Sequence, residues 1–209
     1  MKEYRCLHTE ISGETVISRS RFITTARPVS GAEEAEAFIK SVSKKYSDAT
    51  HNCYAYVANP EMTEMKFSDD GEPQGTAGQP MLEVLKKRGI ACTAVVVTRY
   101  FGGIKLGAGG LVSAYTKCVA DILDRADIRV KKPSVFFKVE LSYQVYNALE
   151  KRLRNGVWDI SEVSYGNVVA FTAAVPAIYA DEAERELKDK SAGTASVIRL
   201  KEDYHSYKN

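Results

Sequence analysis

The amino-acid sequence predicts an α+β protein built from two domains, and three observations carry this prediction. In residues 135–201, strand-like and helix-like segments follow one another in the order βαββαβ, the split-βαβ arrangement of ferredoxin-like domains. Residues 14–124 combine strands with three helices that have apolar faces of their own. Between them lies the charged, proline-bearing segment DIRVKKPS, residues 127–134, which we interpret as a linker. The predicted domains therefore cover residues 1–130 and 131–209.

The elements of the first half are predicted from capping residues and periodicity. Ser30 and Glu33 form a capping box for the first helix, and Gly89 is a typical end of the second. The β-branched run from Val95 to Val97 indicates a strand covered on both faces. Residues 14–28 are predicted to be rich in strand, and further strands are predicted at 53–58, in a short segment ending at Phe67, and at 90–98. The predicted helices are an amphipathic segment from Ser30 to Tyr46, then 81–88 and 109–124.

The second half is predicted in the same way. Tyr165, Gly166 and Asn167 indicate a tight hairpin between its two middle strands. The polar segment EDYHSYKN, residues 202–209, is expected to be frayed. The predicted strands are 135–141, 157–164, 167–175 and 194–201, and the predicted helices are 143–154 and 179–190.

The most informative segment is TRYFGGIKLGAGGL, residues 98–111, in which a strand leads through a glycine-rich turn into a helix. A helix N-terminus offers unpaired N–H groups and partial positive charge, so Arg99 and Lys105 beside it favour an anion such as phosphate. The spacing matches neither common nucleotide-binding glycine motif, and close packing of helix on sheet is the alternative explanation. The predicted anion- or nucleic-acid-binding residues are Arg99, Tyr100, Phe101, Gly102, Gly103, Lys105, Gly107, Gly109, Gly110 and Arg21.

A second unusual segment, SDDGEPQGTAGQPM, covers residues 68–81 and reads as an irregular acidic loop that leads into a helix. Its carboxylates at Asp69, Asp70 and Glu72 could hold Mg²⁺ together with a bound phosphate. Three acidic residues in a loop more commonly form a solvated turn, so we predict no metal. The loop is expected to border the anion site with Asp69, Asp70, Gly71, Glu72, Pro73, Gly75, Thr76 and Gly78.

His51 and Cys53 stand two residues apart on a predicted strand and therefore share a face. An imidazole near a thiol lowers the thiol pKa, and Asp70 or Glu72 could orient the imidazole for catalysis. The alternative is a buried thiol beside a hydrogen-bonded histidine. We favour that alternative, and predict neither a catalytic residue nor a cofactor.

Composition restricts the classes of function. The 209 residues include 29 basic and 27 acidic side chains, a net charge of +2, so nucleic-acid contact would need a local patch such as Arg19, Arg21, Arg99, Lys105 and Lys117. The sequence shows no run approaching the roughly 20 apolar residues of a membrane helix, and its polar start does not resemble a signal peptide. Four cysteines without a C-x-x-C pair indicate reduced thiols. We therefore expect a cytoplasmic protein without membrane contact.

The two segments, together with ATHNCYA at residues 49–55, resemble the motifs of the IMPACT family, in particular its bacterial YigZ-like branch. The resemblance implies an N-terminal domain like the second domain of ribosomal protein S5 and a ferredoxin-like C-terminal domain similar to one of elongation factor G. It also implies a link to translation, because eukaryotic relatives regulate translation by binding a protein activator of a stress kinase.

The sequence thus favours a non-catalytic regulator of translation or stress that binds RNA, the ribosome or a translation factor through its glycine-rich turn. Two alternatives stay open. One is a small-molecule enzyme that binds phosphate in the same pocket, and the other is a regulator that binds only protein partners.

Overall fold

A computed structural model describes residues 2–207 and divides the chain into two compact units. Tyr4–Val130 form the N-terminal unit, and the chain from Lys131 onward, with the residues before Tyr4, forms the C-terminal unit. Each unit has a hydrophobic core of its own. The predicted α+β class is confirmed. No helix in residues 2–207 has the length and apolar character needed to cross a membrane.

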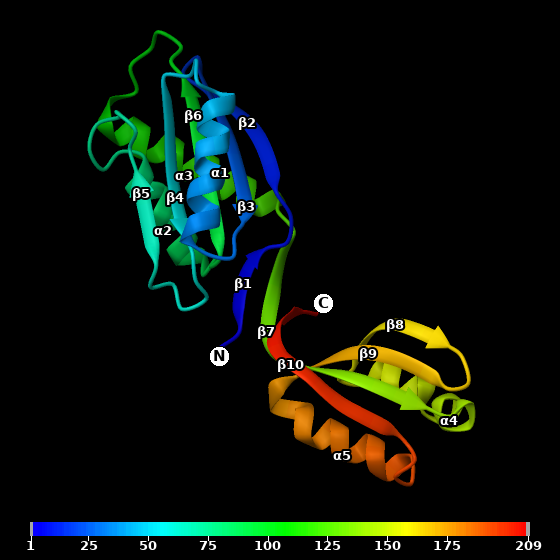
Figure 1. The fold of residues 1–209 in the computed structure, drawn as a ribbon. Coiled ribbons are helices and arrows are strands. Elements are labelled where there is room, and N and C mark those ends of the chain that lie inside the picture. The colour runs from blue at the N-terminus through cyan, green and yellow to red at the C-terminus, as the bar shows by residue number, and fades with distance from the viewer. Residues whose placement is uncertain (1, 208–209) are drawn as a thin grey trace. The chain divides into compact units, whose positions relative to one another are not determined.

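The N-terminal unit has three layers, with a five-stranded antiparallel sheet between helices (Figure 1). In sheet order the strands are β2 (Ile11–Ile17), β3 (Ser20–Pro28), β6 (Thr93–Tyr100), β4 (His51–Val57) and β5 (Met65–Ser68). The helices are α1 (Ala32–Lys45), α2 (Gly78–Arg88) and α3 (Gly107–Arg125). Helix α1 covers one face of the sheet, and α2 and α3 cover the other.

Strand β6 lies at the centre of this sheet and is buried on both faces, as its β-branched run predicts. Val95 and Val97 belong to the core beneath α2 and α3, whereas Ala94 and Val96 pack with α1. The alternation is the two-residue period of a strand, so every side chain in this run contributes to one of the two cores.

The C-terminal unit has the predicted βαββαβ order. Its elements are β7 (Ile128–Leu141), α4 (Tyr143–Asn155), β8 (Asp159–Tyr165), β9 (Val169–Pro176), a short 3₁₀ turn η1 (Ala177–Tyr179), α5 (Ala180–Lys190) and β10 (Ser196–Ser206). The strands pair antiparallel in the order β10, β7, β9, β8. Strand β1 (Tyr4–Leu7) belongs to the N-terminal unit. Tyr146 and Leu153 of α4 and Leu187 of α5 pack into one core with Phe171 of β9.

Two segments expected to be irregular are strands for one shared reason. The boundary between the two units falls within 127–134, the segment interpreted as a linker, but most of that segment lies in β7. Residues 202–206 of the polar segment expected to fray lie within β10. These two stretches pair with each other, from Val135 with Glu202 to Lys131 with Ser206. Neither segment shows strand periodicity by itself, because its stability comes from backbone pairing with the other. Residues 208–209 of the expected tail lie outside the described residues.

The first capping box is also shifted by one residue. The N-cap of α1 is Gly31, and Ser30 binds the carboxylate of Glu34 through its backbone N–H at 2.9 Å and its hydroxyl at 2.8 Å. Glu33, the partner expected from the sequence, is the second helical residue. The helix begins one residue later than Ser30 would dictate, so the reaching carboxylate also moves by one.

Candidate functional site

The acidic loop, residues 68–81, and the end of β6 meet in a buried ion pair. Arg99 Nη1 donates to Glu72 Oε1 at 2.6 Å, and the two side chains are 6% and 3% exposed. Tyr115 of α3 donates its hydroxyl to the same carboxylate oxygen at 2.8 Å. The loop, the central strand and α3 are therefore joined by one buried carboxylate.

Aromatic rings surround the rest of the Arg99 guanidinium. The ring centroids of Phe22 and Phe101 lie 5.5 Å and 5.6 Å from its Cζ, distances typical of cation–π contact. Nη2 donates to Ser20 Oγ at 3.3 Å, and Nε is buried without a hydrogen-bond partner in the described part of the chain. Arg99, expected from the sequence to meet an external anion, is thus engaged by groups inside the protein.

The acidic side chains of the loop organise its own backbone. The Asp69 carboxylate accepts N–H bonds from Gly75 at 2.8 Å, Ala77 at 3.0 Å and Gly78 at 2.8 Å. Asp70 Oδ2 accepts the N–H of Asn52 at 2.6 Å. All three carboxylates proposed for a cation therefore have protein partners. Among residues 2–207 no group of His, Cys, Asp and Glu side chains is arranged to hold a metal ion.

The remaining loop residues are held by close backbone contacts. Thr76 donates both its N–H and its hydroxyl to the carbonyl of Pro73, at 3.0 Å and 2.6 Å. A Cβ on Gly78 would lie 2.6 Å from the carbonyl oxygen of Ser68, so only glycine fits there. Gly71 and Gly75 take left-handed conformations, with φ of 84° and 76°. The glycines of this loop are explained by its own fold.

His51 and Cys53 both contact the acidic loop. His51 Nδ1 donates to the carbonyl of Asp70 at 2.7 Å, and its Nε2 lies 3.8 Å from Glu72 Oε2. The Cys53 thiol donates to the carbonyl of Asp69 at 2.9 Å, and its sulfur lies 3.4 Å from the Tyr115 hydroxyl. Burial, together with the nearby carboxylates, raises the pKa of Cys53 to about 12. The thiol is therefore protonated at neutral pH. Because the thiolate is the nucleophilic form, this does not favour a role of Cys53 as a nucleophile.

We use the name glycine turn for residues 101–110, which connect β6 to the first turn of α3, and its glycines have different causes. A Cβ on Gly102 would lie 1.9 Å from the carbonyl oxygen of Arg19, so this glycine permits close packing on the β2–β3 hairpin. Gly103 and Gly107 have positive φ, 86° and 71°, which favours glycine at both. Gly109 has neither cause, because a Cβ there would meet no atom within 4 Å. Close packing therefore does not explain Gly109.

Basic and apolar side chains are exposed around this turn. Lys105 and Arg19 are exposed, and neither has an ion-pair partner among the described residues. Arg21 pairs with Glu14 at 2.9 Å and lies over the ring of Tyr100, 5.6 Å from its centroid. We call Arg19, Arg21 and Lys105 the basic patch.

The structure also adds residues that sequence reasoning did not assign to the site. Ile104 extends the exposed apolar surface of the turn, and Tyr115 of α3 binds Glu72. A tyrosine on the inward-facing stripe of a helix indicates a polar group buried nearby, because a buried hydroxyl needs a hydrogen-bond partner. Gly110 completes the first turn of α3. A Cβ added at this position would lie 3.1 Å from the Cβ of Leu106.

The site lies within a region that is shared with known proteins. Residues 18–123, which include the acidic loop and the glycine turn, match the family described as the Impact N-terminal domain. The IMPACT family member YvyE of Bacillus subtilis is 45% identical over 162 residues, which are 78% of this chain and 75% of the relative. The IMPACT family member YigZ of Escherichia coli is 37% identical over 188 residues, 89% of this chain and 92% of the relative.

A solved structure agrees with the fold over nearly the whole chain. It is described as the crystal structure of a hypothetical protein, is 34% identical, and superposes with a TM-score of 0.63 over 96% of this chain and 98% of that one. Together, the family match and the relatives that align over most of their length confirm the resemblance seen in the three sequence motifs. The chain belongs to the IMPACT family.

Proposed function

We propose that this protein regulates translation or a stress response, without catalysis, by binding RNA of the translation machinery through the glycine turn and the basic patch. The connection to translation rests on IMPACT family membership, since the sequence resemblance links eukaryotic relatives to translational control. The observation that carries the choice of surface is the open space around Gly109.

Gly109 lowers the stability of α3 without a reason inside the fold. Glycine within a helix is less stable than alanine by about 0.5–1 kcal/mol. At Gly109 neither a positive φ nor a neighbouring atom requires the missing Cβ. A side chain there would stand in front of the N–H groups of the first helical turn, which are the groups that bind phosphate oxygens. A partner that approaches this backbone closely would account for the glycine.

The surroundings of the turn suit a nucleic acid. Lys105 and Arg19 supply positive charge that no described carboxylate neutralises, and Arg21 is half exposed. Phe101 and Ile104, 46% and 42% exposed, offer apolar surface next to these charges. Phosphates bind to cations and bases stack on aromatic rings, so this combination favours single-stranded RNA.

We assign Arg99 and Glu72 a positioning role in this surface. Their ion pair holds the acidic loop against the end of β6, from which the glycine turn departs. An Arg99 variant would lose binding through damage to this core, so it does not test a phosphate contact. The exposed cations of the basic patch test it directly.

Fluorescence anisotropy of a labelled single-stranded RNA, titrated with the full chain at several salt concentrations, measures the proposed interaction. We expect the double variant Arg19→Gln and Lys105→Gln to bind more weakly. The slope of log affinity against log salt should become shallower by about 1.4, because each lost contact with a single strand removes about 0.7. Parent protein that binds RNA without salt dependence, or not at all, would contradict the proposal and favour a protein partner.

Substitution of Gly109 by alanine separates binding from stability. Gly109→Ala places a methyl group in open space and should raise the free energy of unfolding by up to about 0.5 kcal/mol, the lower end of the range for helix interiors, because Gly109 lies in the first turn. The same change should weaken RNA binding. Thr116→Ala on the same helix is the matched control, since it also improves helix propensity but lies two turns away. If both variants are stabilised and both bind RNA like the parent, the glycine turn is not the binding surface.

A further inference from the structure

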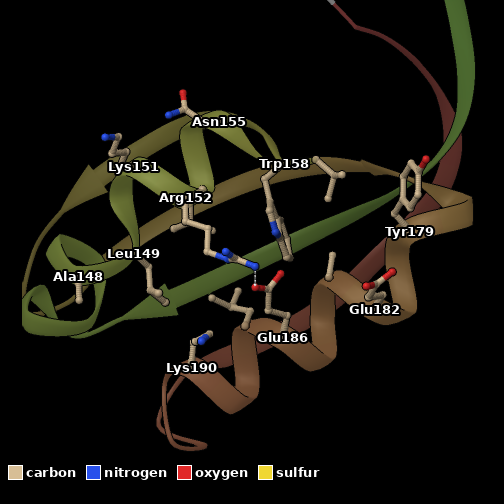
Figure 2. A pocket seen from close by; sticks show the side chains of 15 residues that line it. Ala148, Leu149, Lys151, Arg152, Asn155, Trp158, Tyr179, Glu182, Glu186 and Lys190 are labelled. Atoms are coloured by element: carbon tan, nitrogen blue, oxygen red, sulfur yellow. Dashed lines mark ion pairs between the residues drawn. The ribbon is translucent and has the colours of Figure 1, made fainter.

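The C-terminal unit contains a pocket that the proposed function does not use. It is an open pocket of about 730 Å³ between α4 and α5, which lie on the same face of the sheet (Figure 2). This volume falls in the range of small-molecule sites, about 300–1,000 Å³. All residues that line the pocket belong to the C-terminal unit, so ligand binding there does not depend on RNA binding by the N-terminal unit.

The pocket has an apolar interior. Leu149 and Leu153 of α4, and Ala183 and Leu187 of α5, line it together with Trp158. Figure 2 shows the indole ring of Trp158 directed between the two helices, while Tyr179 lies at the end of the pocket where α5 begins. An aromatic side chain among aliphatic ones is a typical lining for a flat apolar body.

An ion pair crosses the opening of this pocket. Arg152 of α4 reaches toward α5 and pairs with Glu186, and the ion pair lies beside the Trp158 ring (Figure 2). The Arg152 side chain is 65% exposed and that of Glu186 is 37% exposed, so solvent reaches both charges. The lining as a whole contains three cations, including Lys151 and Lys190, and two carboxylates, including Glu182. Since cations exceed carboxylates, the lining favours an anion over a cation.

We propose that this pocket binds a small amphipathic acid: a flat, largely aromatic molecule that carries one carboxylate or similar oxyanion. The ring would occupy the apolar space beside Trp158, and the oxyanion would accept hydrogen bonds from Arg152. A guanidinium binds a carboxylate through two parallel N–H bonds, so the ligand would take the place that Glu186 holds. Glu186 then acts as an internal competitor for the same cation.

Two probes that differ in charge test this assignment on the full chain. The anionic probe is 8-anilino-1-naphthalenesulfonate, and the neutral probe is N-phenyl-1-naphthylamine, which has the same rings without the sulfonate. Trp158 is the single tryptophan of the sequence and lines the pocket, so energy transfer from its fluorescence reports a probe bound nearby. We expect the anionic probe to bind the parent several-fold more tightly than the neutral one.

Substitutions at the two partners of the ion pair should act in opposite directions. Arg152→Gln should weaken binding of the anionic probe roughly fivefold, because it removes the cation. Glu186→Gln should strengthen that binding by about threefold, because it frees Arg152 from its internal partner. Neither change should alter binding of the neutral probe. A purely structural ion pair predicts the same direction of change for both substitutions.

Arg154→Gln is the matched control, since Arg154 is also an exposed arginine of α4 that pairs with a glutamate but does not line the pocket. Ala148→Phe, which fills the pocket from an exposed position, should weaken both probes, and Asn147→Phe on the same helix should weaken neither. Equal affinity for the two probes, or equal effects of Arg152→Gln and Arg154→Gln, would overturn the proposal. Full binding by the Ala148→Phe variant would place the probes elsewhere and would also overturn it.

Discussion

Replacement of Arg99 by methionine should strongly destabilise the N-terminal unit. The change keeps an unbranched side chain but removes the guanidinium, so the Glu72 carboxylate stays buried without its cation. Removal of one partner from a buried ion pair costs about 3–5 kcal/mol. Because Glu72 retains the hydrogen bond from the Tyr115 hydroxyl, we expect about 3 kcal/mol, the lower end of this range.

Urea unfolding followed by far-UV circular dichroism measures this loss in the free energy of unfolding. Two further variants serve as comparisons. The double variant Arg99→Met and Glu72→Met should be at least about 2 kcal/mol more stable than the sum of the single effects predicts, because it leaves no unpaired charge. Lys66→Met breaks the exposed pair with Glu36, whose side chains are 52% and 55% exposed, and should cost less than about 1 kcal/mol. If Arg99→Met costs no more than Lys66→Met, the buried ion pair does not hold the acidic loop against β6.

Two further predictions concern the buried thiol and the C-terminal unit. Iodoacetamide should modify Cys53 in the native protein very slowly at neutral pH and faster as the pH rises toward 12, the raised pKa of its thiol, so rapid labelling at pH 7 would contradict the assignment. A fragment that begins at Lys131 should unfold cooperatively, with coincident transitions by circular dichroism and Trp158 fluorescence, since it contains a complete core; an unstructured fragment would show that this unit does not fold alone.

The sequence predicted those elements whose signals are local. The stripe of α1, the left-handed Gly89 at the end of α2 and the β-branched run of β6 each depend on residues a few positions apart, and the structure contains all three. The pairing of 131–135 with 202–206 is different, because neither segment has a pattern of its own. Propensity and periodicity cannot detect a strand that is stabilised mainly by its distant partner.

The candidate site shows the same limit. Both unusual segments could be singled out by composition, and the contact of the acidic loop with the end of β6 follows from their common sheet. The pairing of Arg99 with Glu72 could not be predicted, because the groups around it come from distant parts of the sequence. The Phe22 ring lies against Arg99, and Tyr115 binds the same Glu72 carboxylate. In the sequence, a basic residue beside a glycine-rich turn indicates an external anion. In the structure, the anion that Arg99 binds is Glu72 of the same chain.

The long ladder between β7 and β10 has a consequence for the order of folding during synthesis. All strands and helices of the N-terminal core lie before residue 130, so this unit can fold while later residues are still being added. Strand β7 is made next, but one of its neighbours, β10, ends only at Ser206. The ribosome must therefore release almost the whole described chain before β7 gains both neighbours, and until then this strand has an unpaired edge that chaperones or other nascent chains could bind.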